Sequence, residues 1–213
     1  DSSTDGYLPP EKVQQLLDAA GIQRAKEVVA STRQELLSGA KEIGYPLAMK
    51  VIGPVHKSDV GGVALNISDE ETLLEKFHHM MTIPQTTAIL MQPMLSGTQI
   101  FIGAKREGNF GHLILCGLGG IFVETLKDIN YSLSPVSREE ADEMIRTLRS
   151  YRILEGTRGQ EGVNIPMFSE AVRRVSALCQ AAPEIFEMDI NPLMAGTRQI
   201  TAVDARIRIE KER

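Results

Sequence analysis

A lysine within an apolar run is the feature that most constrains how this chain folds. The segment 47–63 reads LAMKVIGPVHKSDVGGV, and strand alternation places Lys50 on the face opposite to Met49 and Val51. A lysine inside such a run is costly unless an anion meets it. We therefore predict a strand with one apolar face, and with Lys50 on the other face interacting with an anionic group.

The residues after this run predict a hairpin. Gly53-Pro54 breaks the run, and Gly61-Gly62 precedes a second apolar run, Val63 to Ile67. The connecting loop contains His56, and a polar, glycine-bearing loop of this kind is suited to phosphate. The simpler interpretation is a snorkelling edge lysine and a solvated histidine.

Composition limits the function classes. The 213 residues are enough to bury a core, and 42% hydrophobic with 24% charged residues is ordinary for a globular protein. The net charge is −5 and the basic residues are scattered, which argues against a nucleic-acid or anionic-membrane surface. Cys116 and Cys179 follow no metal or redox spacing, so a reduced, cytoplasmic protein is expected.

Neither a membrane-spanning run nor a signal pattern is present in the sequence. The chain begins with Asp1 rather than methionine, and residues 1–9 are typical of a linker. We infer a fragment of a longer polypeptide or a processed subunit. The last residues, 210–213, are interpreted as a tail.

Helical periodicity and capping residues predict several helices separated by strands. Capping boxes are expected at Thr32–Glu35, Ser68–Glu71 and Ser137–Glu140, and Pro183 is expected to end a helix over 167–181. Runs with turn-rich separators predict an antiparallel meander. The expected strands are Ala88–Met94, Ile100–Arg106, Gly111–Gly117, Ile121–Glu124 and Ile129–Leu133.

The second informative stretch lies near the end of the chain. In the segment EMDIN a strand places Glu187, Asp189 and Asn191 on one face, and Pro192 is expected to stop it. A strand over 200–209 is expected to bring Asp204 opposite this row. Carboxylates and an amide that converge repel unless a cation joins them, and such hard oxygen ligands suit Mg²⁺. The alternative is a solvated sheet face.

Taken together, these motifs resemble the nucleotide-binding half of NDP-forming acyl-CoA synthetases, an ATP-grasp domain related to the succinyl-CoA synthetase β subunit. The resemblance extends over about 10–209 and is specific because several long motifs occur in the same order. The matching segments are GYPLAMKVIGPVHKSDVGGV at 44–63, FGHLILCGLGGIFVETLKDINYSLSP at 110–135, GTRG at 156–159, EMDINPL at 187–193 and AVDARI at 202–207.

The resemblance implies an α+β ATP-grasp fold over residues 10–209, with two α+β subdomains whose antiparallel sheets enclose a nucleotide cleft. The smaller nucleotide-binding lobe is expected at about 22–95 and the larger lobe, with the metal-binding tail, in the remainder. The implied activity moves a phosphoryl group between ATP or ADP and a phosphohistidine or acyl phosphate. The implied partner is a CoA-binding, α-type domain or subunit, which handles the acyl-CoA or organic acid.

Particular residues acquire roles from the resemblance. Lys50 is expected to contact the α- and β-phosphates, and the segment 92–95 is expected to hold adenine. The remaining implied roles are adenine contacts by Gln92, Met94 and Leu95, Mg²⁺ binding by Asn191 and Asp204, support of a phosphohistidine by Asp189, phosphate acceptance by His56, and phosphate contact by Arg158.

The sequence departs from the family pattern at three places. It has Gln99 where a glutamate is usual, His112 where a proline is usual, and Glu161 and Asn164 where an aspartate is expected after the GTRG loop. Loss of acids near a Mg-nucleotide lowers turnover without abolishing the fold. A second hypothesis therefore stays open, in which this is a weak ATP-binding regulatory domain fused to a protein acetyltransferase.

Overall fold

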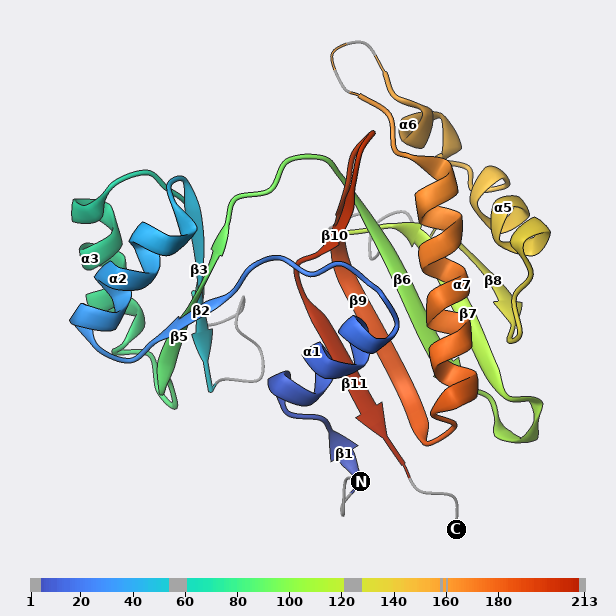
Figure 1. The fold of residues 1–213 in the computed structure, drawn as a ribbon, viewed down its shortest axis with the longest axis horizontal. Coiled ribbons are helices and arrows are strands. Elements are labelled where there is room, and N and C mark those ends of the chain that lie inside the picture. The colour runs from blue at the N-terminus through green and yellow to red at the C-terminus, as the bar shows by residue number, and fades with distance from the viewer. Residues whose placement is uncertain (1–4, 54–60, 121–127, 158, 160, 211–213) are drawn as a thin grey trace. The chain divides into compact units, whose positions relative to one another are not determined.

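A computed structural model describes residues 5–53, 61–120, 128–157, 159 and 161–210. The chain divides into two compact units (Figure 1). The smaller unit comprises Ala25–Leu95, and the larger unit comprises Asp1–Arg24 together with Ser96–Arg213. Each unit is an antiparallel sheet with helices on one face, so the α+β class expected from the sequence is confirmed.

The smaller unit is a four-stranded sheet in the order β2-β5-β3-β4, covered on one face by two helices (Figure 1). Its elements are β2 (Val28–Ala30), α2 (Arg33–Ile43), β3 (Leu47–Ile52), β4 (Val63–Ile67), α3 (Glu70–Met80) and β5 (Ala88–Pro93). Leu36 of α2, Leu73 of α3 and Met49 of β3 are fully buried in one core. This unit therefore has its own hydrophobic core.

The predicted hairpin is present in the smaller unit. Strands β3 and β4 pair antiparallel, with Lys50 opposite Val63. Residues 54–60 of the connecting loop, including His56, lie outside the described residues.

Two of the three predicted capping boxes are confirmed, at Thr32–Glu35 and Ser137–Glu140. The third prediction, at Ser68–Glu71, is wrong. The N-cap of α3 is Asp69, whose Oδ1 accepts a hydrogen bond from the Thr72 N–H at 2.8 Å. The Ser68 hydroxyl donates to Asp69 instead of capping the helix. A carboxylate next to the helix N-terminus is the stronger acceptor for the first-turn N–H groups.

The larger unit is a seven-stranded sheet in the order β1-β11-β9-β6-β7-β8, with β10 paired to β9. Helices α1, α5 and α7 lie in front of this sheet in Figure 1. The elements are β1 (Gly6–Tyr7), α1 (Pro10–Ala19), β6 (Thr98–Arg106), η1 (Gly108–Phe110), β7 (His112–Leu118), β8 (Ile129–Leu133), α5 (Arg138–Arg146), α6 (Tyr151–Glu155), α7 (Ile165–Ala181), β9 (Ile185–Ala195), β10 (Ile200–Ala202) and β11 (Ala205–Ile209).

The predicted meander is confirmed for β6, β7 and β8, which pair in sequence, each antiparallel. Its first predicted strand, Ala88–Met94, is wrongly placed, because β5 pairs with β2 and β3 in the smaller unit and not with β6. The predicted strand Ile121–Glu124 lies outside the described residues. Two short elements were not anticipated. Gly6–Tyr7, within the segment interpreted as linker, pairs with β11, and α6 forms just before the glycine-rich stretch.

The tail differs from expectation in two respects. Strand β9 does not stop at Pro192 but continues to Ala195, and the predicted strand 200–209 is divided into β10 and β11. On one side, β9 pairs with β11 up to Ile190 and with β10 from Leu193. Pro192 lies where the strand changes partner, a position at which the missing N–H costs no ladder bond.

Two further sequence expectations concern membrane spans and cysteines. Among the described residues, no helix has the length and apolar character to cross a membrane. Cys116 and Cys179 are both free and buried. Burial raises the pKa of each thiol to about 12, so both are poor nucleophiles near neutral pH.

Candidate functional site

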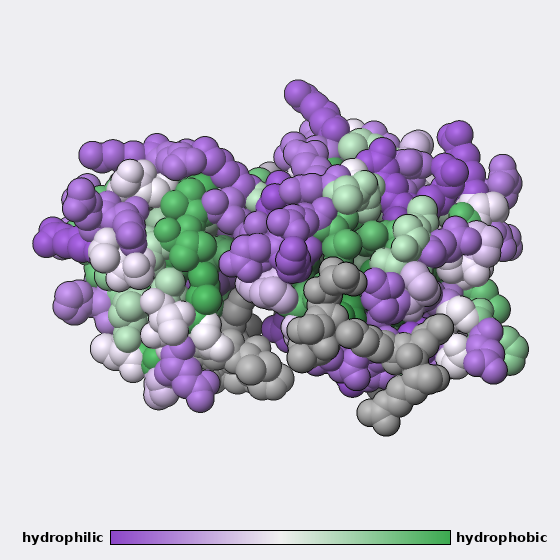
Figure 2. Space-filling view, turned by 60° about the horizontal axis from the view of Figure 1, so that its bottom comes forward, coloured by the Kyte–Doolittle hydropathy of each residue, from purple (hydrophilic) through white to green (hydrophobic). Residues whose placement is uncertain are grey.

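The smaller unit presents Lys50 on the sheet face that its helices leave uncovered. Met49 and Val51 are fully buried under the helices, whereas Lys50 is half-buried, so the predicted alternation is confirmed. Its neighbours Leu90 and Ile52 are apolar, and Val29 on β2 is 52% exposed. Figure 2 shows hydrophobic residues at the surface of this unit, on the left. This face combines apolar surface with one cation, a chemistry that suits a base and a phosphate.

The segment predicted to hold adenine begins on the same sheet face. Gln92 follows Leu90 at a spacing of two and is 1% exposed. Its amide Nε2 donates to Glu27 Oε1 at 2.7 Å, which fixes the orientation of the Gln92 amide. The backbone N–H of Met94 donates to the Pro46 carbonyl at 3.1 Å, and Leu95 is the last residue of the smaller unit.

The larger unit carries the row of oxygen ligands predicted on β9. Met188 and Ile190 are buried against the helices, so Glu187, Asp189 and Asn191 lie on the uncovered face, as predicted. Glu187 is exposed, whereas Asp189 and Asn191 are half-buried. The row therefore becomes less accessible to water towards Asn191.

Asp204 lies beside this row, in the turn between β10 and β11. The backbone N–H of Asn191 donates to the Asp204 carbonyl at 3.1 Å, and Ala205 is paired with Ile190. One carboxylate oxygen of Asp204 accepts the N–H of Ala205 at 3.0 Å. The structure thus brings Asn191 and Asp204 together, as the sequence predicted.

A glycine turn that the sequence left without a defined role contacts Asn191. The N–H of Gly120 donates to Asn191 Oδ1 at 2.9 Å. Gly120 has φ of 62°, and a side chain there would collide with Gln99 Oε1. Gly119 in turn donates its N–H to the Gln99 carbonyl at 2.8 Å. Gln99 and the glycine turn therefore position the Asn191 amide, whose oxygen keeps a second lone pair for a cation.

Asp189 is electrostatically the most unusual group of the row. Burial raises its pKa to about 6; the facing Arg206 lowers the pKa, while the negative charges of Asp204 and Glu187 raise it further. Arg206 was not among the residues predicted for the site. Its spacing of two from Asp204, along a strand, was the signal that both side chains share one face.

The side chains of this sheet face decide which kind of metal site is possible. Within the described ranges, no three His, Cys, Asp or Glu side chains are grouped closely enough to hold a metal. Asn191 and Asp204 supply only oxygen ligands, and Mg²⁺ is usually held by one or two carboxylates together with phosphates and water. These residues therefore fit Mg²⁺ that arrives with a nucleotide, and do not fit a metal held by protein ligands alone.

Two of the predicted site residues, His56 and Arg158, lie outside the described residues.

The positions that depart from the family pattern have structural partners. The ring Nε2–H of His112 donates to the Ile185 carbonyl at 2.6 Å. Asn164 caps α7 by accepting the Met167 N–H at 3.1 Å, and Glu161 accepts from the Thr197 hydroxyl at 3.2 Å.

The fold and the side chains define the class of protein. The two antiparallel α+β units, with a lysine on one sheet and a row of oxygen-bearing side chains on the other, are those of an ATP-grasp protein. The family model described as the ATP-grasp domain matches residues 2–209. The chain therefore belongs to the ATP-grasp family.

Similar proteins are ADP-forming acetate–CoA ligases. The chain is 37% identical over 210 residues to the β subunit of acetate–CoA ligase [ADP-forming] I from Pyrococcus furiosus, covering 94% of this chain and 90% of the subunit. It is 40% identical over 201 residues to acetate–CoA ligase [ADP-forming] II from Archaeoglobus fulgidus. That match covers 90% of this chain but only 29% of the relative, so the chain spans less than a third of this relative's length.

Solved structures agree with these relatives. The dinucleotide-forming acetyl-coenzyme A synthetase 1 of Ca. Korarchaeum cryptofilum, in complex with coenzyme A, Ca-AMPCP and HgCl⁺, has a TM-score of 0.89 and 31% identity, covering 96% of this chain and 94% of that chain. A second structure of that protein contains coenzyme A and Mg-AMPPCP, with its phosphohistidine segment pointing towards the nucleotide-binding site. Its TM-score is 0.83 at 32% identity, covering 96% and 93% of the two chains.

Proposed function

We propose that this chain is the nucleotide-binding part of an NDP-forming acyl-CoA synthetase. It transfers a phosphoryl group between ATP or ADP and a phosphohistidine or acyl phosphate, during formation or cleavage of an acyl-CoA. The observation that carries this proposal is the match to an ADP-forming ligase β subunit over 94% of this chain and 90% of that subunit. The reaction is completed by a CoA-binding, α-type partner in the cytoplasm.

In this proposal, the smaller unit binds the base and part of the phosphate chain. Lys50 contacts the α- and β-phosphates as a point charge. Gln92, Met94 and Leu95 contact the adenine, which is supported by the fixed amide of Gln92 and the apolar neighbours of Lys50.

Asn191 and Asp204 hold the Mg²⁺ that accompanies the nucleotide, and this ion supplies charge neutralisation on the phosphate oxygens. The Gly120 N–H orients the Asn191 oxygen, so the chain fixes one ligand before the nucleotide binds. Asp189 supports a phosphohistidine of the partner by accepting a hydrogen bond from its ring. His56 receives the phosphoryl group within this chain, and Arg158 contacts phosphate.

The metal assignment is tested by Asp204→Ala. Removal of the carboxylate should weaken binding of Mg-ATP about tenfold or more, because Mg²⁺ loses its only charged protein ligand. Isothermal titration calorimetry of the full-length protein measures the Mg-ATP affinity. The same measurement tests Lys50→Met, which should weaken ATP binding with or without Mg²⁺.

The matched control is Glu187→Ala, which removes an exposed carboxylate from the same sheet face. Its Mg-ATP affinity and melting temperature should equal those of the wild type. Unchanged Mg-ATP affinity in Asp204→Ala, with the protein folded, rejects the metal assignment. Equal ATP binding by Lys50→Met identifies the lysine as a surface residue.

The role of His56 is tested by phosphoryl labelling. A neutral imidazole near pH 7 is a competent nucleophile. Radiolabelled ATP, Mg²⁺ and the partner should give an acid-labile phosphoenzyme, and His56→Asn should lose the label carried by this chain. Label retained in that variant excludes the histidine. A folded protein that binds Mg-ATP but never acquires label or forms acyl-CoA supports the regulatory alternative, which Gln99 favours.

A further inference from the structure

Among the strands of the described residues, β8 is the last on its side of the larger sheet, and its outer edge carries hydrogen-bonding groups. The Ser134 N–H donates to the His112 carbonyl at 2.8 Å, and the register then continues with Ser132 opposite Ile114. Hydrogen-bonded pairs alternate along an antiparallel ladder, so the N–H and C=O groups of the intervening residues Tyr131 and Leu133 point away from β7. Such an edge is a template for a further strand.

The two faces of β8 differ in chemical character. Tyr131 and Leu133 are 66% and 47% exposed on the uncovered sheet face, beside Leu115 and Leu113 of β7. Asn130 and Ser132 point to the other face, where α5 lies. An added strand would therefore meet apolar side chains on one face and helix α5 on the other.

A hollow of about 480 Å³ lies between β8 and α5. Tyr131 and Ser132 line it from the strand, and Glu140, Glu143 and Met144 line it from the helix. Glu140 uses one carboxylate oxygen to cap α5, accepting the Ser137 N–H at 2.8 Å, and still contributes negative charge. We call this hollow and the outer edge of β8 the β8–α5 groove; its helix side is acidic.

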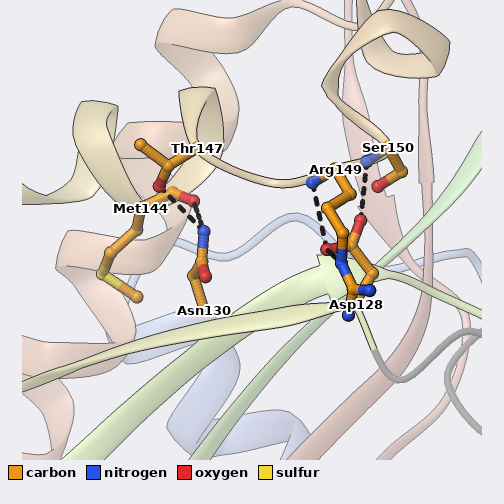
Figure 3. Close-up of polar contacts among 6 residues, drawn as sticks. All are labelled: Asp128, Asn130, Met144, Thr147, Arg149 and Ser150. Carbon is orange, nitrogen blue, oxygen red and sulfur yellow. Dashed lines mark hydrogen bonds and ion pairs between the residues drawn. The ribbon is translucent and has the colours of Figure 1, made fainter.

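Two sets of hydrogen bonds join the start of β8 to the end of α5 and the turn that follows it (Figure 3). The Asn130 side-chain amide donates to the Met144 carbonyl at 2.7 Å and to the Thr147 hydroxyl at 2.9 Å. Asp128, directly before β8, accepts the N–H groups of Arg149 and Ser150 at 3.0 and 2.7 Å. The C-terminal end of α5 and the turn that follows it are thereby fixed against the strand, so this side of the groove is formed before a ligand arrives.

We propose that the β8–α5 groove binds an extended, cationic peptide segment, which adds a strand to β8. Backbone hydrogen bonds to Tyr131 and Leu133 supply affinity, and alternate side chains supply specificity. Apolar residues of the segment pack beside Tyr131 and Leu133, while lysine or arginine residues between them meet Glu140 and Glu143. Charge complementarity with the acidic helix selects a cationic segment over a neutral or acidic one.

The first test uses a short fluorescent peptide that alternates lysine with valine, and a matched peptide that alternates glutamate with valine. Fluorescence anisotropy with the full-length protein should show saturable binding of the lysine peptide, at least about tenfold tighter than the glutamate peptide. Equal affinity for the two peptides, or binding of neither, overturns the proposal.

Variants then locate the bound peptide. Tyr131→Pro removes an outward N–H and places a ring at the edge without removing a bond to β7, and should weaken binding about tenfold or more. Glu143→Lys should weaken it about fivefold. Glu139→Lys is the matched control, because it makes the same charge change on the same helix at an exposed position that does not line the hollow, and should leave affinity unchanged.

Two readouts separate the proposal from its competitors. Mg-ATP affinity should be unchanged in Tyr131→Pro, which shows that the variant is folded. Sedimentation velocity tests whether β8 instead pairs with β8 of a second copy. A dimer that Tyr131→Pro abolishes and that the lysine peptide does not displace assigns the edge to self-association, and overturns the proposal. If Glu139→Lys and Glu143→Lys weaken binding of the lysine peptide equally, the proposal is overturned as well, because the electrostatic attraction then does not come from residues that line the groove.

Discussion

Asp189 shows how burial and neighbouring charge act on a single carboxyl group. Its pKa of about 6 is above the unfolded value, because half-burial and the charges of Asp204 and Glu187 outweigh the attraction of Arg206. A group with a raised pKa in the folded state stabilises the protein at low pH, and this stabilisation is lost as pH rises through that pKa. Ionised Asp189 therefore costs stability above about pH 6.

Asp189→Asn should remove this cost. In the absence of Mg²⁺, we expect the variant to be more stable than the wild type at pH 8 by about 2 to 3 kcal/mol, with the gain vanishing near pH 4. Urea unfolding at a series of pH values measures the difference. Glu187→Gln, at an exposed position, should show a much smaller dependence. A gain that is the same at pH 4 and pH 8 contradicts the assigned pKa.

At the scale of single elements, short local signals decide where helices begin. Ser137 accepts the Glu140 N–H at 3.1 Å, and Glu140 in return accepts the Ser137 N–H. This reciprocal cap fixes the start of α5, whose residues Ala141 and Ile145 are fully buried in the core of the larger unit. The cap thus contributes both to the helix and to the position of the β8–α5 groove.

Ser137→Ala should lower the free energy of unfolding of the larger unit by about 1 kcal/mol, because one first-turn N–H loses its acceptor. Ser137→Thr keeps the hydroxyl and should stay close to the wild type. Urea unfolding followed by circular dichroism compares the two variants. Equal midpoints for the alanine and threonine variants would show that the cap has no energetic role.

At the scale of the whole molecule, the chain is stabilised by two separate cores. Leu36 belongs to the core of the smaller unit and Ile114 to that of the larger unit, and both are fully buried. Each sheet is covered on one face by helices from its own unit of the chain. Local unfolding of one unit therefore need not open the core of the other.

Leu36→Ala should destabilise the smaller unit by about 2 to 5 kcal/mol, through lost burial and the remaining cavity. Native-state hydrogen exchange should then show faster exchange in β2, β3 and β5 and unchanged protection in β6, β7 and β9. Ile114→Ala should give the reciprocal pattern. Faster exchange across both units in either variant would show that the two cores unfold together.

Much of the fold and part of the candidate site could be predicted because local patterns specify them. The alternation of Met49, Lys50 and Val51 specifies which strand face is buried, and the same alternation specifies the oxygen row on β9. The error at Ser68 arose because Asp69, one residue later, is a competing cap whose carboxylate is the stronger acceptor. Strand β9 continues through Pro192 because its pairing partner changes there from β11 to β10, and no local sequence pattern encodes that change.

The sequence by itself determined the class of fold, the order of its longer strands and helices, and the residue types that suit a Mg-nucleotide. Only the tertiary structure decided which distant groups meet: the Gly120 N–H on the Asn191 oxygen, Arg206 opposite Asp189, and Asn130 against the end of α5. Periodicity depends on residues a few positions apart and is visible in the chain. Such contacts depend on strand register and turn geometry across many residues, which are fixed only when the sheet and its helices pack together.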